Sequence, residues 1–201
     1  MGFPDPYTFV ALEVLTAAQM NAIQSNISGL ISLAVFSQPL KLIDSMPPLS
    51  DVTAAPVDSV ESSGAAPNPA WLRMLLDASA DEGRQWEFIL DRRYGTSPTL
   101  KIHYYMAGAN TNKTVCFAAQ IAAVSDSDTS VTAKPFDTVN SSTVTVPDAA
   151  GTEDVASITL TNDDSMAAGD RVMLLLYRDV SEDDAAGDCV VTDVELQFSP
   201  S

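Results

Sequence analysis

The sequence predicts a mainly β protein whose principal domain is an eight-stranded antiparallel β-sandwich of the jelly-roll kind. From Trp71 onward, apolar and polar residues alternate with a period of two, and turn signals recur at short intervals. An extended N-terminal arm, one short α-helix and a linker rich in Pro, Ser and Ala come before that point. We therefore divide the chain into arm and helix at 1–35, linker at 36–70 and sandwich at 71–201. An immunoglobulin-like sandwich is the alternative, although the usual Cys, Trp, Cys arrangement is absent.

Two of the eight expected strands show what this pattern predicts for the core. The segment 171–178 is a nearly continuous apolar run, which is typical of a central strand, and 113–124 is apolar on both faces. Two sheets of four strands would then pack face to face. The expected strands span 71–77, 84–91, 99–106, 113–124, 142–146, 155–161, 171–178 and 188–198.

Alternation within a strand predicts which side chains face solvent. In the segment 99–106 every second residue is apolar, so Lys101, His103 and Tyr105 are expected on the polar face. The last strand, 188–198, is expected to keep a single alternation along its length, with Thr192 on the same face as its neighbours two residues away.

A short helix is expected after Leu15, because Thr16 and Gln19 have the spacing of a capping box. Apolar residues then recur at intervals of three and four on an otherwise polar helix, which is the stripe of a short coiled coil. Isoleucine at consecutive core positions favours three or more strands in such a bundle. The stripe could equally dock on the protein's own sandwich. The residues expected to mediate oligomerisation are Met20, Ile23, Ile27 and Leu30.

Prolines dominate the segment between the helix and the first expected strand. Pro47, Pro48, Pro56, Pro67 and Pro69 interrupt it, and it has little periodicity. Proline stiffens the backbone and removes a hydrogen-bond donor, so this segment is predicted to be an extended linker. A short run at 40–43 could still add one edge strand.

The charge balance excludes one class of partner. The chain has 27 acidic and 10 basic residues and a formal net charge of -17. Nucleic-acid binding needs clustered Lys and Arg, so neither DNA nor RNA is an expected partner. The start does not resemble a signal peptide, and apolar stretches are too short to span a bilayer, so no membrane is expected. Cys116 and Cys189 are expected to be buried free thiols, with an inter-strand disulfide as the alternative.

Catalytic patterns are not found. The only histidine is His103, no GxSxG sequence is present, and the two cysteines lack metal-ligand spacing. We therefore expect no enzyme, no cofactor and no metal. Three Asp-rich segments, 125–129, 162–165 and 179–188, have oxygen ligands that could hold calcium, but Asp is also common in exposed turns.

Aromatic residues suggest a further possibility, a surface on which sugars stack. Core packing accounts for Trp86 and Tyr104, which fall on apolar faces. Trp71 belongs to the same set of aromatic residues. Tyr94, beside Gly95, and Tyr105, on the polar face of its strand, are the expected surface contacts.

The N-terminal sequence resembles that of tailed-bacteriophage virion proteins. In those proteins a pattern F-x-x-G-E-x-L-T-A-A-x-x-N precedes a helix, and residues 7–21 follow it with Leu12 in place of the Gly. The stretches 95–105, 166–172 and 176–179 are similar to β-domains of phage structural proteins. The resemblance implies a virion protein of the capsid-decoration or head-fibre type, a homotrimer that binds its own copies and the major capsid protein.

Two functions therefore remain open for the sandwich. The first is decoration of a capsid, without turnover; the alternative is a receptor-binding or glycan-binding module of a tail fibre or baseplate. A concave, exposed cluster around Tyr94 and Tyr105 would favour glycan binding, and a flat, fully packed exterior would favour decoration. A calcium-stabilised sandwich of a cell-surface filament would require an export route. Localisation in the virion follows from the resemblance alone.

Overall fold

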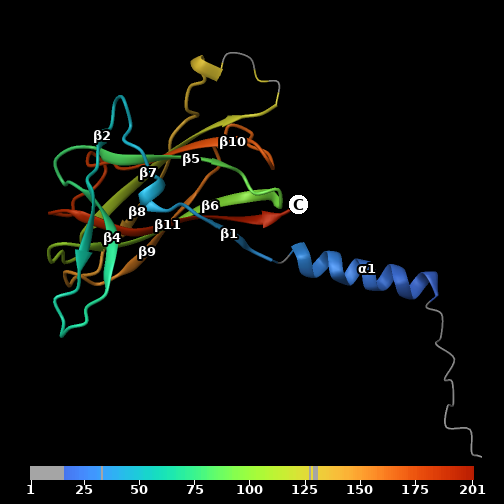
Figure 1. The fold of residues 1–201 in the computed structure, drawn as a ribbon, viewed down its shortest axis with the longest axis horizontal. Helices are drawn as coiled ribbons and strands as arrows, with labels where there is room; N and C mark the ends of the chain where they lie inside the picture. The colour runs from blue at the N-terminus through green and yellow to red at the C-terminus, as the bar shows by residue number, and fades with distance from the viewer. Residues whose placement is uncertain (1–15, 33, 127, 129–130) are drawn as a thin grey trace, which may run out of the picture. The chain divides into compact units, whose positions relative to one another are not determined.

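The computed structural model describes residues 16–201 except 33, 127, 129 and 130 (Figure 1). The expected N-terminal arm therefore lies largely outside the described residues. The chain divides into a helix-bearing part that ends at Ala34 and a larger unit, Val35–Ser201. Each unit is described by itself below.

The larger unit is a two-layer β-sandwich with a short 3-10 turn, η1, at Leu42–Asp44 and another, η2, at Val131–Ala133. Its strands are β1 Phe36–Pro39, β2 Thr53–Ala54, β3 Val57–Glu61, β4 Ala70–Leu76, β5 Glu82–Ile89, β6 Tyr94–Met106, β7 Thr114–Val124, β8 Asn140–Thr145, β9 Asp154–Thr159, β10 Arg171–Arg178 and β11 Cys189–Pro200. A six-stranded sheet has the order β3-β4-β11-β6-β9, with β1 also paired to β11. A five-stranded sheet has the order β2-β5-β10-β7-β8 (Figure 1). The mainly β, sandwich prediction is confirmed.

All eight strands predicted from the sequence are present, and the buried core lies between the two sheets. β10 is the central strand of its sheet, as its continuous apolar run predicts. Tyr104 of β6 meets Phe117 of β7 edge to face across the core, with ring centroids 5.1 Å apart. On β6 the alternation is as expected, with Lys101, His103 and Tyr105 on the outer face, only half-buried.

The strand β11 departs from the single alternation that its sequence suggests. Its register against β6 shifts between Val191 and Asp193, which is a β-bulge that leaves Thr192 as an extra residue. Val191 is buried before the bulge and Val194 is buried after it. The core-facing residues of β11 therefore have odd numbers before the bulge and even numbers after it. Thr192 and Asp193 both lie outside the core as a result.

Residues 36–70, predicted as a linker, form three strands of the sandwich. β1 pairs with β11, β2 with β5 and β3 with β4, so the segment contributes to both sheets. Leu40 and Leu42 between β1 and β2 are buried in the core. These strands have only two to five residues each, too few for a period to be visible in the sequence. Prolines end or precede them rather than interrupt them, which avoids losing ladder hydrogen bonds.

The N-terminal helix, α1, spans Ala17–Ser32. The predicted capping box is present: the backbone N–H of Thr16 donates to Oε1 of Gln19 at 2.8 Å, and the N–H of Gln19 donates to Oγ1 of Thr16 at 3.3 Å. Within the described part of the chain, no helix is long and apolar enough to cross a membrane.

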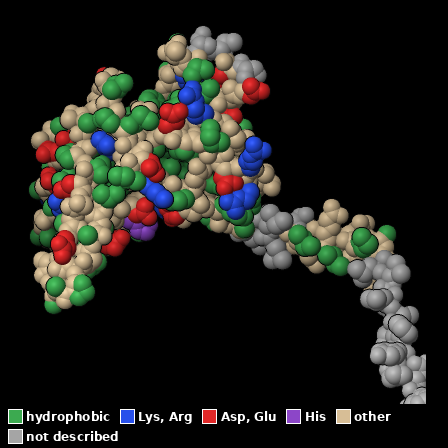
Figure 2. Space-filling model, viewed as in Figure 1, with side chains coloured by type: hydrophobic (Ala, Val, Ile, Leu, Met, Phe, Trp, Pro, Cys, Tyr) green, Lys and Arg blue, Asp and Glu red, His purple; other side chains and the backbone are tan. Residues whose placement is uncertain are grey.

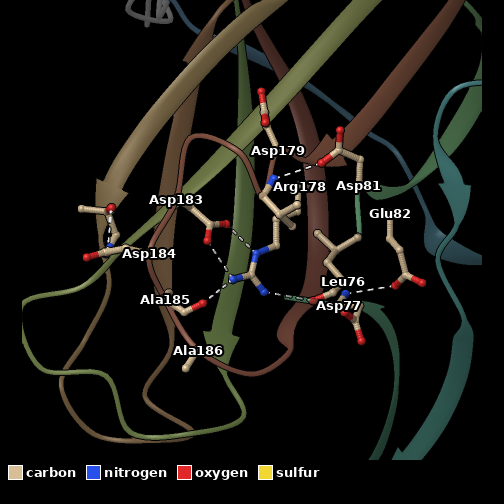
Figure 3. Close-up of polar contacts among 12 residues, drawn as sticks. Leu76, Asp77, Asp81, Glu82, Arg178, Asp179, Asp183, Asp184, Ala185 and Ala186 are labelled. Carbon is tan, nitrogen blue, oxygen red and sulfur yellow. Dashed lines mark hydrogen bonds and ion pairs between the residues drawn. The ribbon is translucent and has the colours of Figure 1, made fainter. Parts of the chain in front are cut away.

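A buried arginine holds one end of the sandwich together. Arg178, at the end of β10, is 0% exposed. Its Nε and Nη2 donate to the two carboxylate oxygens of Asp183 at 2.7 and 3.1 Å. Two of the remaining N–H groups donate to the carbonyl oxygens of Leu76 and Ala185 at 3.3 and 2.7 Å (Figure 3). The last donates to the carbonyl oxygen of Gly187 at 2.8 Å. All five guanidinium N–H groups are thus satisfied by β4 and by the loop that joins β10 to β11.

We predict that Asp183→Ala lowers the free energy of unfolding by about 3–5 kcal/mol, because it leaves the buried guanidinium charge without its counter-ion. Urea unfolding monitored by Trp fluorescence measures the change. The matched control is Glu87→Ala, which removes an exposed carboxylate 3.2 Å from Arg171 and should cost about 0–1 kcal/mol. Equal losses in the two variants would show that burial of the Arg178 pair is unimportant.

Candidate functional site

A shallow, open groove of about 390 Å³ lies on the outer face of the six-stranded sheet. We call it the aromatic groove, because a tryptophan and a tyrosine contribute to its walls. The strand β11 and the segment before β9 supply the remaining lining. Its lining residues are Trp71, Tyr105, Gly151, Glu153, Thr192 and Asp193.

Strand parity and the bulge of β11 bring these side chains together. On β4, Met74 and Leu76 face the core, so Trp71 lies on the opposite face and is 39% exposed. On β11, the bulge turns two consecutive residues, Thr192 and Asp193, out of the core. A regular strand would have turned one of them inward, so the bulge is what gives the groove two adjacent polar groups.

Gly151 closes the groove beside β6. Its backbone N–H donates to the carbonyl of Met106 at 2.9 Å, which attaches the turn before β9 to the end of β6. Its φ of 73° lies in the left-handed region that favours glycine. Glu153 follows two residues later and reaches the groove from this turn.

Arg73 of β4 interacts with Tyr105 and forms an ion pair with Asp58 of β3. Asp58 accepts two hydrogen bonds from Arg73, from Nε at 2.8 Å and from Nη2 at 3.1 Å. Hydrogen bonding to Asp58, followed by interaction with the Tyr105 hydroxyl, raises the pKa of Arg73 above its ordinary value. The same Arg73 hydrogen bonds lower the pKa of Asp58.

Two other basic side chains on this face also have polar partners. His103 Nδ1 lies 3.5 Å from Oε1 of Glu153. Lys101 Nζ donates to Oγ of Ser157 at 2.8 Å. Acidic and basic side chains are interspersed over the visible surface of the sandwich (Figure 2).

The structure separates the two tyrosines that the sequence suggested as surface contacts. Tyr105 lines the aromatic groove. Tyr94 is only 5% exposed, so the expectation of a surface contact there is wrong. Its ring packs edge to face on Phe198 with centroids 5.4 Å apart, and its hydroxyl donates to Asp163 at 3.4 Å. The pairing of Tyr94 with Pro200 places the start of β6 beside the end of β11, where the Tyr94 ring faces the core and meets Phe198.

The residues predicted to mediate oligomerisation lie on α1. Met20, Ile23 and Ile27 are 58%, 46% and 51% exposed. The side chain of Leu30 lies outside the described residues. The three described side chains therefore present an unburied apolar stripe.

Sequence reasoning missed four residues of the groove, Gly151, Glu153, Thr192 and Asp193. Glu153, Thr192 and Asp193 carry no pattern of their own, and only the register of distant strands brings them together. Trp71 was one of the aromatic residues considered for a sugar-stacking surface, but it was not chosen as an expected contact. The alternation Leu72, Met74, Leu76 in β4 would have placed it on the outer face, away from the core.

The other candidate chemistry flagged in the sequence has structural explanations. Cys116 and Cys189 are buried free thiols, as predicted, and burial raises the pKa of each. Carboxylates of the Asp-rich segments accept backbone N–H groups: Asp164 from Ala123 at 2.8 Å and Asp184 from Thr114 at 2.7 Å. Among the residues that the structure describes, no group of three or more His, Cys, Asp or Glu is placed to hold a metal ion.

A second hollow, of about 240 Å³, lies over the five-stranded sheet. Gln85, Leu175 and Gln120 form its floor, side by side on β5, β10 and β7. Leu49 and Phe136 line it from two loops. It has one aromatic residue and no pair of rings, so we treat the aromatic groove as the primary candidate site.

Comparison with known proteins finds no matching family model and no matching curated protein. Solved β-sandwiches do match. The xylan-binding domain from Paenibacillus barcinonensis is 12% identical over 83% of this chain and 99% of its own, with a TM-score of 0.42. The family 11 carbohydrate-binding module from Clostridium thermocellum is 12% identical over 84% of this chain and 91% of its own, with a TM-score of 0.38.

A tailspike also matches. The enzymatically active domain of tailspike protein 4 from bacteriophage CBA120 is 7% identical over 81% of this chain, with a TM-score of 0.36, and the match spans 19% of that chain. All three likenesses are too distant to assign a function, which must come from the groove itself.

Burial of Tyr94 predicts a dependence of stability on alkaline pH. Burial, reinforced by the Asp163 carboxylate, raises the pKa of Tyr94 to about 12, whereas a tyrosine in an unfolded chain titrates near 10. The folded state binds this proton more tightly, so its stabilising contribution is complete below pH 10 and is lost as the pH rises through about 12. In Tyr94→Phe, urea unfolding between pH 9 and 11.5 should lose less stability than in the wild type. If both proteins lost the same stability over this pH range, the alkaline destabilisation could not be assigned to the Tyr94 hydroxyl.

Proposed function

We propose that the protein is a glycan-binding module and that its ligand lies in the aromatic groove. The observation that supports this is the combination of Trp71 and Tyr105 with the polar groups of Glu153, Thr192 and Asp193 in one open groove. Aromatic faces pack against the apolar faces of sugar rings, and a few fixed polar groups orient the hydroxyls. This is the exposed aromatic and polar cluster that favours glycan binding over decoration, built around Tyr105 and Trp71.

The proposed role is binding without turnover. Glycoside hydrolysis needs one carboxylic acid that stays protonated near neutral pH, usually because apolar surroundings raise its pKa. Glu153 and Asp193 are both exposed to solvent. Their setting suits hydrogen-bond acceptors for sugar hydroxyls better than a general acid.

The proposed setting is a virion tail fibre or baseplate. The resemblance of residues 7–21 to tailed-phage virion proteins supports a virion, and a groove for glycans supports recognition of a host surface. Capsid decoration, the first expectation from the sequence, needs no such groove. We therefore place receptor binding ahead of decoration.

We predict that Trp71→Ala weakens glycan binding about 30-fold or more, because a buried aromatic contact at a binding site contributes roughly 2 kcal/mol or more. A glycan array identifies ligands of the wild type, and calorimetry then measures both proteins. Ile89→Ala is the control, since it removes an exposed apolar side chain from the other sheet. The proposal is wrong if the wild type binds no glycan, or if Trp71→Ala binds as tightly as Ile89→Ala.

A second role, self-assembly through α1, has its own supporting observation. The helix has an exposed apolar stripe, and the segment Ala17–Ser32 contains no charged residue, although the chain carries a net charge of -17. Figure 2 shows green and tan side chains on the helix, without red or blue. Copies of a strongly acidic chain can therefore approach through this helix with the least repulsion. We propose a homotrimer, since isoleucine at consecutive core positions favours three or more helices.

We predict that Ile23→Asp with Ile27→Asp converts a trimer into a monomer, because the stripe would then carry two charges per helix at its core. Light scattering on the full chain measures the mass. The matched control introduces the same charges on the opposite face, as Asn21→Asp with Ser25→Asp, and should remain trimeric. A monomeric wild type, or a trimeric stripe variant, would refute assembly through α1.

A further inference from the structure

We infer that the aromatic groove selects an extended oligosaccharide without acidic groups, and that Asp193 and Glu153 act both as acceptors for its hydroxyls and as a barrier to uronic-acid, sulfated and sialylated glycans. This inference rests on the proposed glycan-binding function. It concerns the length and the charge of the ligand, which the structure addresses by two separate lines of reasoning.

The register of the strands indicates the minimum length of the ligand. Val190 of β11 pairs with Tyr105 on one side and with Leu75 on the other. Trp71 precedes Leu75 by four residues on β4. The backbone positions of Trp71 and Tyr105 are thus about 10 Å apart across the strands and about 13 Å apart along them. Both side chains line the same groove from these separated backbone positions. We therefore expect a ligand that contacts both to run across β11 and to be longer than a single pyranose ring.

The polar groups of the groove point to neutral hydroxyls. Oδ1 of Asp193 accepts the backbone N–H of Val194 at 2.9 Å, which fixes the carboxylate while its side chain remains exposed. Thr192 Oγ1 donates to the carbonyl of His103 at 3.3 Å, so its lone pairs remain free to accept. Ionised carboxylates accept hydrogen bonds and cannot donate them, so their partners are the O–H or N–H groups of a ligand.

The carboxylates that line the groove disfavour binding of an anionic ligand. The lining contains two carboxylates, those of Glu153 and Asp193, and no Lys or Arg. None of the three basic side chains nearby lines the groove. Arg73 forms a two-hydrogen-bond ion pair with Asp58, His103 Nδ1 lies 3.5 Å from Glu153, and Lys101 donates to the neutral hydroxyl of Ser157. A uronate, sulfate or sialate would lie within a Debye length of these two carboxylates. Like charges at an interface suppress the wrong partner.

The test compares neutral glucans, mannans and galactans with the same polysaccharides oxidised at C6 to uronic acids, at low and high salt. We expect the wild type to bind at least one neutral polymer and to bind its oxidised counterpart on the order of tenfold more weakly. Higher salt should narrow the difference, since screening weakens repulsion between exposed charges. A tetrasaccharide of the neutral ligand should bind on the order of tenfold more tightly than the monosaccharide.

Two charge variants separate a local from a global effect. Asp193→Asn should improve binding of the oxidised polymer several-fold. Glu87→Gln, which removes an equal charge from the other sheet, should leave it unchanged. If the wild type binds oxidised and neutral polymers equally, or if the two variants behave alike, the charge barrier is wrong while glycan binding stands. Monosaccharide binding as tight as tetrasaccharide binding would overturn the extended ligand. If no glycan of any charge binds, the proposed function fails and this inference fails with it.

Discussion

Arg178 lies in the interior with no exposed surface. At this end of the sandwich, one carboxylate and three backbone carbonyl oxygens accept all of its guanidinium hydrogen bonds. A buried guanidinium without partners would cost much of the folding free energy, so the loop that follows β10 has to fold back and supply acceptors for it. The loop after β10 does so through Asp183, Ala185 and Gly187, and β4 contributes the carbonyl of Leu76. The same loop leads directly into β11. The arginine therefore fixes where β11, the strand with most neighbours in its sheet, begins.

The start of β11 matters because the bulge lies only a few residues further on. Val191 faces the core before the bulge and Val194 after it, while Thr192 and Asp193 between them are displaced to the outer face. These two residues contribute to the groove between Trp71 of β4 and Tyr105 of β6. A constraint in the core thus sets the register of a strand, and the register of that strand places the polar groups of the proposed site.

Sequence reasoning predicted what depends on local periodicity and missed what depends on pairing between distant segments. The eight longer strands, the central position of β10 and the Thr16–Gln19 cap were all predicted, because each has a pattern within a few residues. The bulge was missed, since a strand with apolar residues on both faces, such as Val190 and Val191, does not reveal a change of parity. Tyr94 was misplaced for a related reason: its burial comes from its pairing with Pro200, more than a hundred residues away.

The three short strands of the segment 36–61 have a consequence for the modularity of the protein. They cover edges that belong to β4, β5 and β11, and an uncovered strand edge is a template for aggregation. A fragment that began at Trp71, where the obvious periodicity starts, would expose all three. The smallest portable unit is therefore Val35–Ser201. Any recombination that transfers this sandwich between proteins has to exchange the proline-rich segment together with it.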